Sequence, residues 1–132
     1  RTLLVAEDQL EVRNAMLRTL RGAGYHTLEA KDGDEALVLL RAHAAELSLF
    51  CTDAIMPGRP LAEVLDELRR LRPELPVLLC SGYVAEELVR RDLEAGKNAF
   101  LEKPFTPDSL LNAVAALIGD AGAADLERPG SL

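Results

Sequence analysis

The chain has 132 residues, of which 48% are hydrophobic and 28% are charged, a composition typical of one compact domain with its own core. Its 15 basic and 22 acidic residues give a net charge of −7, which disfavours contact with nucleic acid or with an anionic membrane surface. Three Phe, two Tyr and no Trp make an aromatic stacking platform for single-stranded nucleic acid improbable.

Apolar runs alternate with segments of helical spacing along the chain. In chain order they predict a strand at 3–6, a helix around 12–20, a strand at 25–29, a helix around 36–40, a strand at 47–51, a helix around 64–71, a strand at 76–80, a helix around 85–95, a strand at 99–101 and a helix at 107–118. Strict alternation implies right-handed crossovers and a parallel sheet covered on both faces, so the predicted class is α/β. The domain is expected at residues 1–119, and 120–132 are expected to be a C-terminal tail or linker.

Cys51 and Cys80 lie inside apolar runs without the spacing of a metal site, which predicts reduced and buried side chains. No apolar stretch approaches the roughly 20 residues that span a bilayer, and no signal-peptide pattern is present, so a cytoplasmic location is expected. The chain starts at Arg1 rather than Met, so it could be a piece of a longer protein.

Polar side chains are predicted at the carboxyl ends of four strands, where open parallel sheets bind ligands. The first strand is expected to end at Glu7 and Asp8, the third at Asp53, the fourth at Ser81 and the fifth at Lys103. Two carboxylates about 4 Å apart repel by roughly 4 kcal/mol at an effective dielectric of about 20, so the cluster needs a cation or a proton. A partly open site made of oxygen ligands suits Mg²⁺.

This cluster is also suited to phosphoryl transfer. A carboxylate beside Mg²⁺ and the Lys103 ammonium can accept a phosphoryl group as an acyl phosphate, because the cations neutralise the phosphoryl oxygens in the transition state. Each residue alone is a weak signal, since an isolated Asp or Ser is more often a turn or capping residue. Their occurrence together at four strand ends is what indicates a functional site.

Four motifs stand at these strand ends: Glu7-Asp8 after an apolar run, Thr-Asp-Ala-Ile-Met-Pro-Gly at 52–58, Ser-Gly-Tyr at 81–83 and Phe-Leu-Glu-Lys-Pro-Phe at 100–105. Together they resemble the receiver domain of two-component response regulators, and the resemblance covers about residues 2–119. It implies a single doubly wound, flavodoxin-like fold with a five-stranded parallel sheet in the order 2-1-3-4-5 and five helices on its two faces.

The resemblance implies a metal site. Mg²⁺ would be bound directly by Asp8 and Asp53, through a water by Glu7, and by the backbone carbonyl of Ile55. Position 9 is often acidic in relatives but is Gln9 here, which lowers the local negative charge.

The resemblance also implies a phosphorylation switch. Asp53 would be the phosphoacceptor that attacks a phosphohistidine on a partner, and Lys103 would bind the phosphoryl group. Ser81 would turn its hydroxyl toward that group, and Phe100 would swing into the vacated space. The fourth helix, fifth strand and fifth helix would form the surface that changes.

The implied partner is a histidine kinase or a histidine phosphotransfer domain, and phosphorylation could drive homodimerisation. The sequence at 80–83 and 103–110 is similar to that of receivers at the C-terminal end of hybrid sensor histidine kinases, and no DNA-binding domain follows Gly119. The chain could therefore be the cytoplasmic part of such a kinase. The domain itself would phosphorylate autocatalytically rather than turn over an external substrate.

Two further departures from the family pattern concern loops. Leu61 replaces the usual Gly, which leaves the start of the third helix open. Ile55 and Tyr83 border the route of an attacking water, and their bulk suggests hindered hydrolysis of the phosphorylated form.

Two other functions would require different residues at these positions. A haloacid-dehalogenase-type phosphatase needs a second Asp two residues after the nucleophile, where this chain has Ile55. A dinucleotide-binding enzyme needs a Gly-rich loop after the first strand, where this chain has Glu7 and Asp8. A receiver-like interaction module that works without phosphorylation remains as the alternative.

Overall fold

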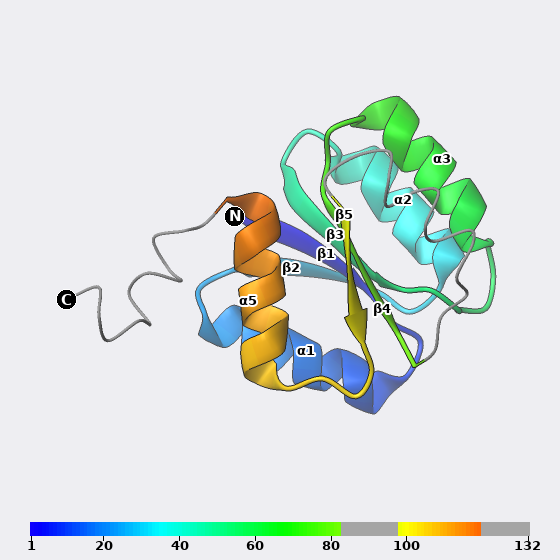
Figure 1. The fold of residues 1–132 in the computed structure, drawn as a ribbon. Helices are drawn as coiled ribbons and strands as arrows, with labels where there is room; N and C mark the ends of the chain where they lie inside the picture. The colour runs from blue at the N-terminus through cyan, green and yellow to red at the C-terminus, as the bar shows by residue number, and fades with distance from the viewer. Residues whose placement is uncertain (83–97, 120–132) are drawn as a thin grey trace.

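The computed structural model describes residues 1–82 and 98–119. Strands and helices alternate from β1 to β4 (Figure 1). The described elements are, in order, β1 (Thr2–Ala6), α1 (Leu10–Gly22), β2 (His26–Ala30), α2 (Gly33–His43), β3 (Leu47–Asp53), α3 (Leu61–Leu71), β4 (Val77–Ser81), β5 (Asn98–Glu102) and α5 (Pro107–Ile118). Four of the five predicted helices lie in this part of the chain. The predicted helix around 85–95, Tyr83 and the predicted tail at 120–132 lie outside the described residues.

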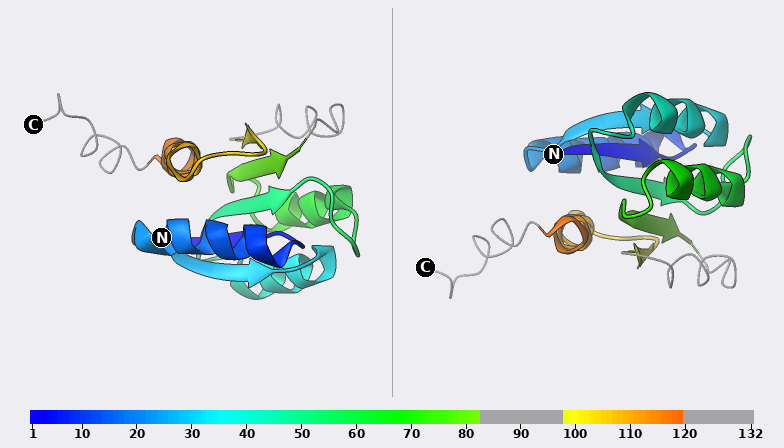
Figure 2. Two further views of the ribbon diagram at one scale, coloured as in Figure 1. Left: turned by 90° about the horizontal axis from the view of Figure 1, so that it is seen from below. Right: turned by 90° about the horizontal axis from the view of Figure 1, so that it is seen from above.

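The five strands form one parallel sheet in the order β2-β1-β3-β4-β5, which confirms the predicted class and strand order. Helices α1 and α5 cover one face of the sheet, and α2 and α3 cover the other (Figure 2). All strands therefore point their carboxyl ends toward the same edge, as a parallel α/β sheet requires.

The core is mostly aliphatic, as the scarcity of aromatic residues predicts, with Phe50 and Tyr25 as its buried aromatic side chains. Leu3 and Val5 point toward α1 and α5, while Leu4 and Ala6 point toward α2 and α3, because successive residues of a strand face opposite sides. Among the described residues, no helix is both long and apolar enough to cross a membrane.

Both cysteines are free and fully buried, as predicted. The Sγ atoms of Cys51 on β3 and Cys80 on β4 lie 3.7 Å apart. Their mutual hydrogen bond and their burial raise the pKa of the Cys51 thiol well above its ordinary value. The thiol therefore stays protonated at neutral pH and acts as a small apolar side chain.

The helix starts follow local sequence signals. Asp32 caps α2 by accepting a hydrogen bond from the Glu35 N–H at 2.8 Å. Thr106 and Ser109 form a capping box at the start of α5, with Pro107 in the first helical position. Helix α3 begins at Leu61 after Pro60 and has no side-chain cap, which settles the start that the sequence left open.

Candidate functional site

The predicted polar residues meet at the carboxyl edge of the sheet. Asp53 and Ser81 are the last residues of β3 and β4, Glu7 and Asp8 follow β1, and Lys103 follows β5. One carboxylate oxygen from each of Glu7, Asp8 and Asp53 lies within 4.8 Å of the others. These three carboxylates are called the acidic cluster below.

Lys103 reaches the acidic cluster from the end of β5, on the other side of β3 from Glu7 and Asp8. Its Nζ donates hydrogen bonds to Glu7 Oε1 and, at 3.1 Å, to Asp53 Oδ2. Its backbone N–H donates to the carbonyl of Ser81 at 2.7 Å, which ties the end of β5 to the end of β4. The ammonium thus stands between two of the three carboxylates and offsets their repulsion.

Burial differs across the acidic cluster. Glu7 is 1% exposed, and the Asp53 side chain is 13% exposed, whereas Asp8 faces solvent. Burial raises the pKa of Glu7 above its ordinary value, although Lys103 and the Gln9 N–H partly oppose the effect. Asp53 and Asp8 are thus the carboxylates of the cluster that an approaching group can reach.

Two opposing effects set the pKa of Lys103. Burial lowers it, but the hydrogen bonds to Glu7 and Asp53 outweigh burial and raise the pKa above its ordinary value. Lys103 is therefore a cation at every physiological pH.

Arg13 on α1 holds the turn that carries the acidic pair. Its Nη1 donates to the carbonyl of Glu7 at 2.8 Å, and its Nε donates to Glu29 Oε2 on β2 at 3.1 Å. The Gln9 N–H donates to Glu7 Oε2 at 3.0 Å, so backbone and side chain of Glu7 are both fixed. Sequence reasoning missed Arg13, whose one signal is a basic residue one helical turn beyond Gln9.

The remaining predicted residues lie around this centre in different ways. The Ile55 N–H donates to Asp53 Oδ1 at 3.3 Å, and its side chain is 54% exposed. Ser81 is 3% exposed at the end of β4. Phe100 on β5 is half-buried and packs against the core cluster that includes residues of α2 and α3. The structure thus brings the acids and Lys103 together and leaves Phe100 outside that contact.

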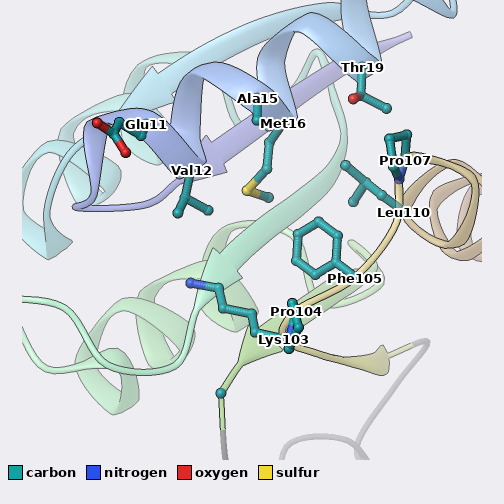
Figure 3. Close-up of a pocket in the computed structure, with 11 residues that line it drawn as sticks. Glu11, Val12, Ala15, Met16, Thr19, Lys103, Pro104, Phe105, Pro107 and Leu110 are labelled. Carbon is teal, nitrogen blue, oxygen red and sulfur yellow. The ribbon is translucent and has the colours of Figure 1, made fainter.

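An apolar groove borders the site between α1 and the segment from Lys103 to α5. Its volume is about 580 Å³. Figure 3 shows Val12, Ala15 and Met16 on the α1 side, facing Phe105 and Leu110. Lys103 lies at the end of the groove nearest the acidic cluster, so the groove leads up to Asp53.

A known protein family matches most of the chain. The profile of the response regulator receiver domain matches residues 3–115. The chain belongs to this family. As a receiver domain it takes part in two-component signalling, and the resemblance predicted from the motifs is confirmed.

Relatives of this receiver domain include larger proteins. It is 35% identical over 118 residues to the sensor kinase CckA of Brucella abortus, a match that covers 89% of this chain and 12% of CckA. It is 33% identical over 115 residues to the transcriptional regulatory protein PdtaR of Mycobacterium tuberculosis, covering 86% of this chain and 55% of PdtaR. The receiver domain thus spans only part of these curated relatives.

Solved structures agree with the fold. The receiver domain of the hybrid histidine kinase CckA superimposes with a TM-score of 0.75 at 32% sequence identity, covering 89% of this chain and 99% of that one. Similarity to a hybrid kinase receiver, predicted from the sequence around Ser81 and Lys103, is therefore confirmed.

The donor atoms of the receiver domain fit Mg²⁺. The acidic cluster offers carboxylate oxygens from three residues and no nitrogen or sulfur ligand, which is the preference of a hard divalent cation. Glu7 is almost fully buried, whereas Asp8 faces solvent and Asp53 is partly exposed, so an entering ion reaches Asp8 and Asp53 first. This arrangement favours Asp8 and Asp53 as direct ligands and Glu7 as a ligand acting through water.

Proposed function

We propose that this receiver domain accepts a phosphoryl group from a phosphohistidine onto Asp53. An Asp53 carboxylate oxygen attacks phosphorus, the P–N bond of the donor breaks, and the histidine nitrogen leaves with its electron pair and takes up a proton. The observation that supports this reaction is the meeting of Asp53 with two further carboxylates and the Lys103 ammonium at one strand edge.

Mg²⁺ is the proposed cofactor. Asp8, Asp53 and the backbone carbonyl of Ile55 would bind it directly, and Glu7 would bind it through a water. When bound, the ion neutralises charge on the phosphoryl oxygens. The buried Glu7 adds negative charge to the site without exposing a second reactive carboxylate to the donor.

Lys103 binds the phosphoryl group in the proposed reaction. Before transfer its Nζ is shared between Glu7 and Asp53, and transfer converts the Asp53 carboxylate into an acyl phosphate with more negative charge. The ammonium then follows the charge to the phosphoryl oxygens. Ser81 is proposed to donate its hydroxyl to the same oxygens, and Phe100 to change position in response.

The proposed donor is a histidine kinase or a histidine phosphotransfer domain. The apolar groove beside Lys103 supports a protein donor, because a small phosphoryl compound needs no apolar surface next to the phosphoacceptor. Similarity to the CckA receiver supports a place in a hybrid sensor kinase, where the kinase activity would lie in another domain.

A mass measurement tests the phosphoacceptor proposal. Incubation with acetyl phosphate and Mg²⁺ is expected to add one phosphoryl group to the intact chain. Chelation of Mg²⁺ with EDTA should remove this gain, because the acidic cluster then repels the anionic donor. If the chain gains no phosphoryl mass from acetyl phosphate or from phosphohistidine donors, the phosphorylation-independent interaction module becomes the better account.

The proposed protein donor predicts a split between two kinds of phosphorylation. Ala15 is exposed on α1 and lines the groove, so Ala15→Lys places a charged chain there without touching the acidic cluster. Transfer from a protein donor should fall by about tenfold or more, the cost of losing roughly 1.4 kcal/mol of binding. Phosphorylation by acetyl phosphate should stay unchanged.

The matched control is Asn14→Lys, which adds the same charge at the neighbouring exposed position of α1. It should leave both kinds of phosphorylation within about twofold, since surface changes away from a contact have small effects. Equal transfer rates for Ala15→Lys and the unchanged chain would rule out the groove as the donor's contact surface.

A further inference from the structure

We infer that Gly33, the first residue of α2, is a positioning residue for the metal-binding carbonyl of Ile55. Residues 54–60, called the acceptor loop, connect Asp53 to α3. Gly33 has no side chain, which lets the acceptor loop pack directly on the start of α2. This inference rests on the proposed function, since it concerns the same Mg²⁺ site.

The contact between Gly33 and the acceptor loop is a backbone contact. The Gly33 N–H donates to the carbonyl of Pro57 at 3.2 Å. A Cβ atom added at Gly33 would lie 2.1 Å from the Arg59 carbonyl oxygen and 2.8 Å from Arg59 Cβ. Such distances are far inside van der Waals contact, so any side chain at position 33 must push the loop away.

Backbone conformation does not explain why residue 33 is a glycine. The glycines with positive φ among the described residues are Gly24, Gly58 and Gly119, and Gly33 is not one of them. Alanine would fit the helical backbone at this position and has a higher helix propensity than glycine. The close approach of the acceptor loop is therefore what requires glycine.

A push on Arg59 would be transmitted toward Ile55. The acceptor loop is held at both ends, because the Ala54 N–H donates to the carbonyl of Cys80 at 3.3 Å and Leu61 begins α3. The Ile55 side chain is 54% exposed, so it adds little anchorage to a backbone whose N–H is bound to Asp53 Oδ1. We therefore expect a displaced Arg59 to be accommodated by torsion changes within residues 54–60, which include Ile55.

The neighbouring ion pair is a weaker link. Arg59 Nε lies 3.1 Å from Asp34 Oδ1, but the two side chains are 49% and 60% exposed. Exposed pairs contribute little, because water screens them and both side chains lose freedom. The shape of the contact at Gly33, rather than this ion pair, is expected to place the loop.

The test compares Gly33→Ala with Gly22→Ala. An added Cβ at Gly22, at the end of α1, meets nothing within 4 Å, so this variant makes the same chemical change in open space. Mg²⁺ affinity is measured by calorimetry without any phosphoryl donor. Gly33→Ala should raise the Mg²⁺ dissociation constant by about tenfold, as changes to residues that orient metal ligands do. The dissociation constants of Gly22→Ala and Asp34→Asn should stay within about twofold of the unchanged chain.

Two further measurements separate positioning from general damage. At saturating Mg²⁺ the phosphorylation rate of Gly33→Ala should return to within about threefold of the unchanged chain, which a loosened fold would not permit. In the metal-free protein, the amide resonances of Ile55 and Asp53 should shift in Gly33→Ala and not in Gly22→Ala. Unchanged Mg²⁺ affinity in a folded Gly33→Ala variant would overturn the inference.

Arg59→Gly provides an independent variant if Gly33→Ala does not fold. It keeps Gly33 but frees the loop backbone at the point of contact, so Mg²⁺ affinity should again fall several-fold, and an unchanged affinity would overturn the inference. Failure of the unmodified chain to bind Mg²⁺ would instead contradict the proposed function, so the two failures are distinguishable.

Discussion

Asp53→Asn is expected to abolish phosphorylation by acetyl phosphate and by phosphohistidine donors. An amide is a poor nucleophile and cannot form the acyl phosphate, and Glu7 cannot replace Asp53 because it is buried and bound to Lys103. The rate should fall at least about 100-fold, which corresponds to roughly 2.7 kcal/mol of barrier. Intact mass over time measures this directly.

The matched control for this change is Asp66→Asn, which alters an exposed Asp on α3. It should phosphorylate at the normal rate. Urea unfolding of Asp53→Asn should show that the fold persists, because the amide is isosteric with the carboxylate and Lys103 keeps its contact with Glu7. A phosphoryl gain in Asp53→Asn that matches the unchanged chain would exclude Asp53 as the acceptor.

Lys103→Met is the second change with a large expected effect. Met keeps most of the aliphatic length but removes the ammonium that would bind the phosphoryl oxygens, so phosphorylation at saturating Mg²⁺ should slow by about 10²- to 10³-fold. Mg²⁺ itself should bind at least as tightly as before, because the positive charge beside Glu7 and Asp53 is gone. Calorimetry and phosphorylation kinetics together measure this opposite response.

Lys31→Met is the control for Lys103→Met. Lys31 is a surface lysine whose side chain is 65% exposed and whose Nζ lies 3.6 Å from Glu35. This variant should change neither Mg²⁺ affinity nor phosphorylation rate by more than about twofold. If Lys103→Met phosphorylates as fast as Lys31→Met, Lys103 has no part in binding the phosphoryl group.

The sequence was sufficient to predict the acidic cluster because strand ends and parallel topology together define one edge. The expected strand boundaries differ from the observed ones by one or two residues, as with Glu7 and Lys103, which follow their strands rather than end them. Asp53 and Ser81 end their strands as expected. Tyr25 was expected in the second strand, but its N–H donates to the carbonyl of Leu20 at the end of α1. These differences do not move any site residue to another edge.

Contacts between distant segments could not be predicted from the sequence. Arg13 reaches Glu7 and Glu29 only because α1 packs against β1 and β2. The close approach of Gly33 to Arg59 depends on how the acceptor loop folds back on α2, and helical periodicity carries no information about it. Periodicity locates elements and their faces, whereas such contacts depend on the packing between elements.

Chemical mapping of the phosphorylated residue tests the central claim most directly. The chain is phosphorylated with Mg²⁺ and a phosphohistidine donor, the acyl phosphate is reduced with borohydride, and peptides are sequenced by mass spectrometry. Reduction converts a phosphorylated Asp into homoserine, and the account predicts homoserine at position 53 and at no other acidic position. Homoserine at Asp8 or another Asp, the five-carbon hydroxynorvaline at Glu7, or no reduced residue despite transfer from the same donor to another receiver domain, would contradict it.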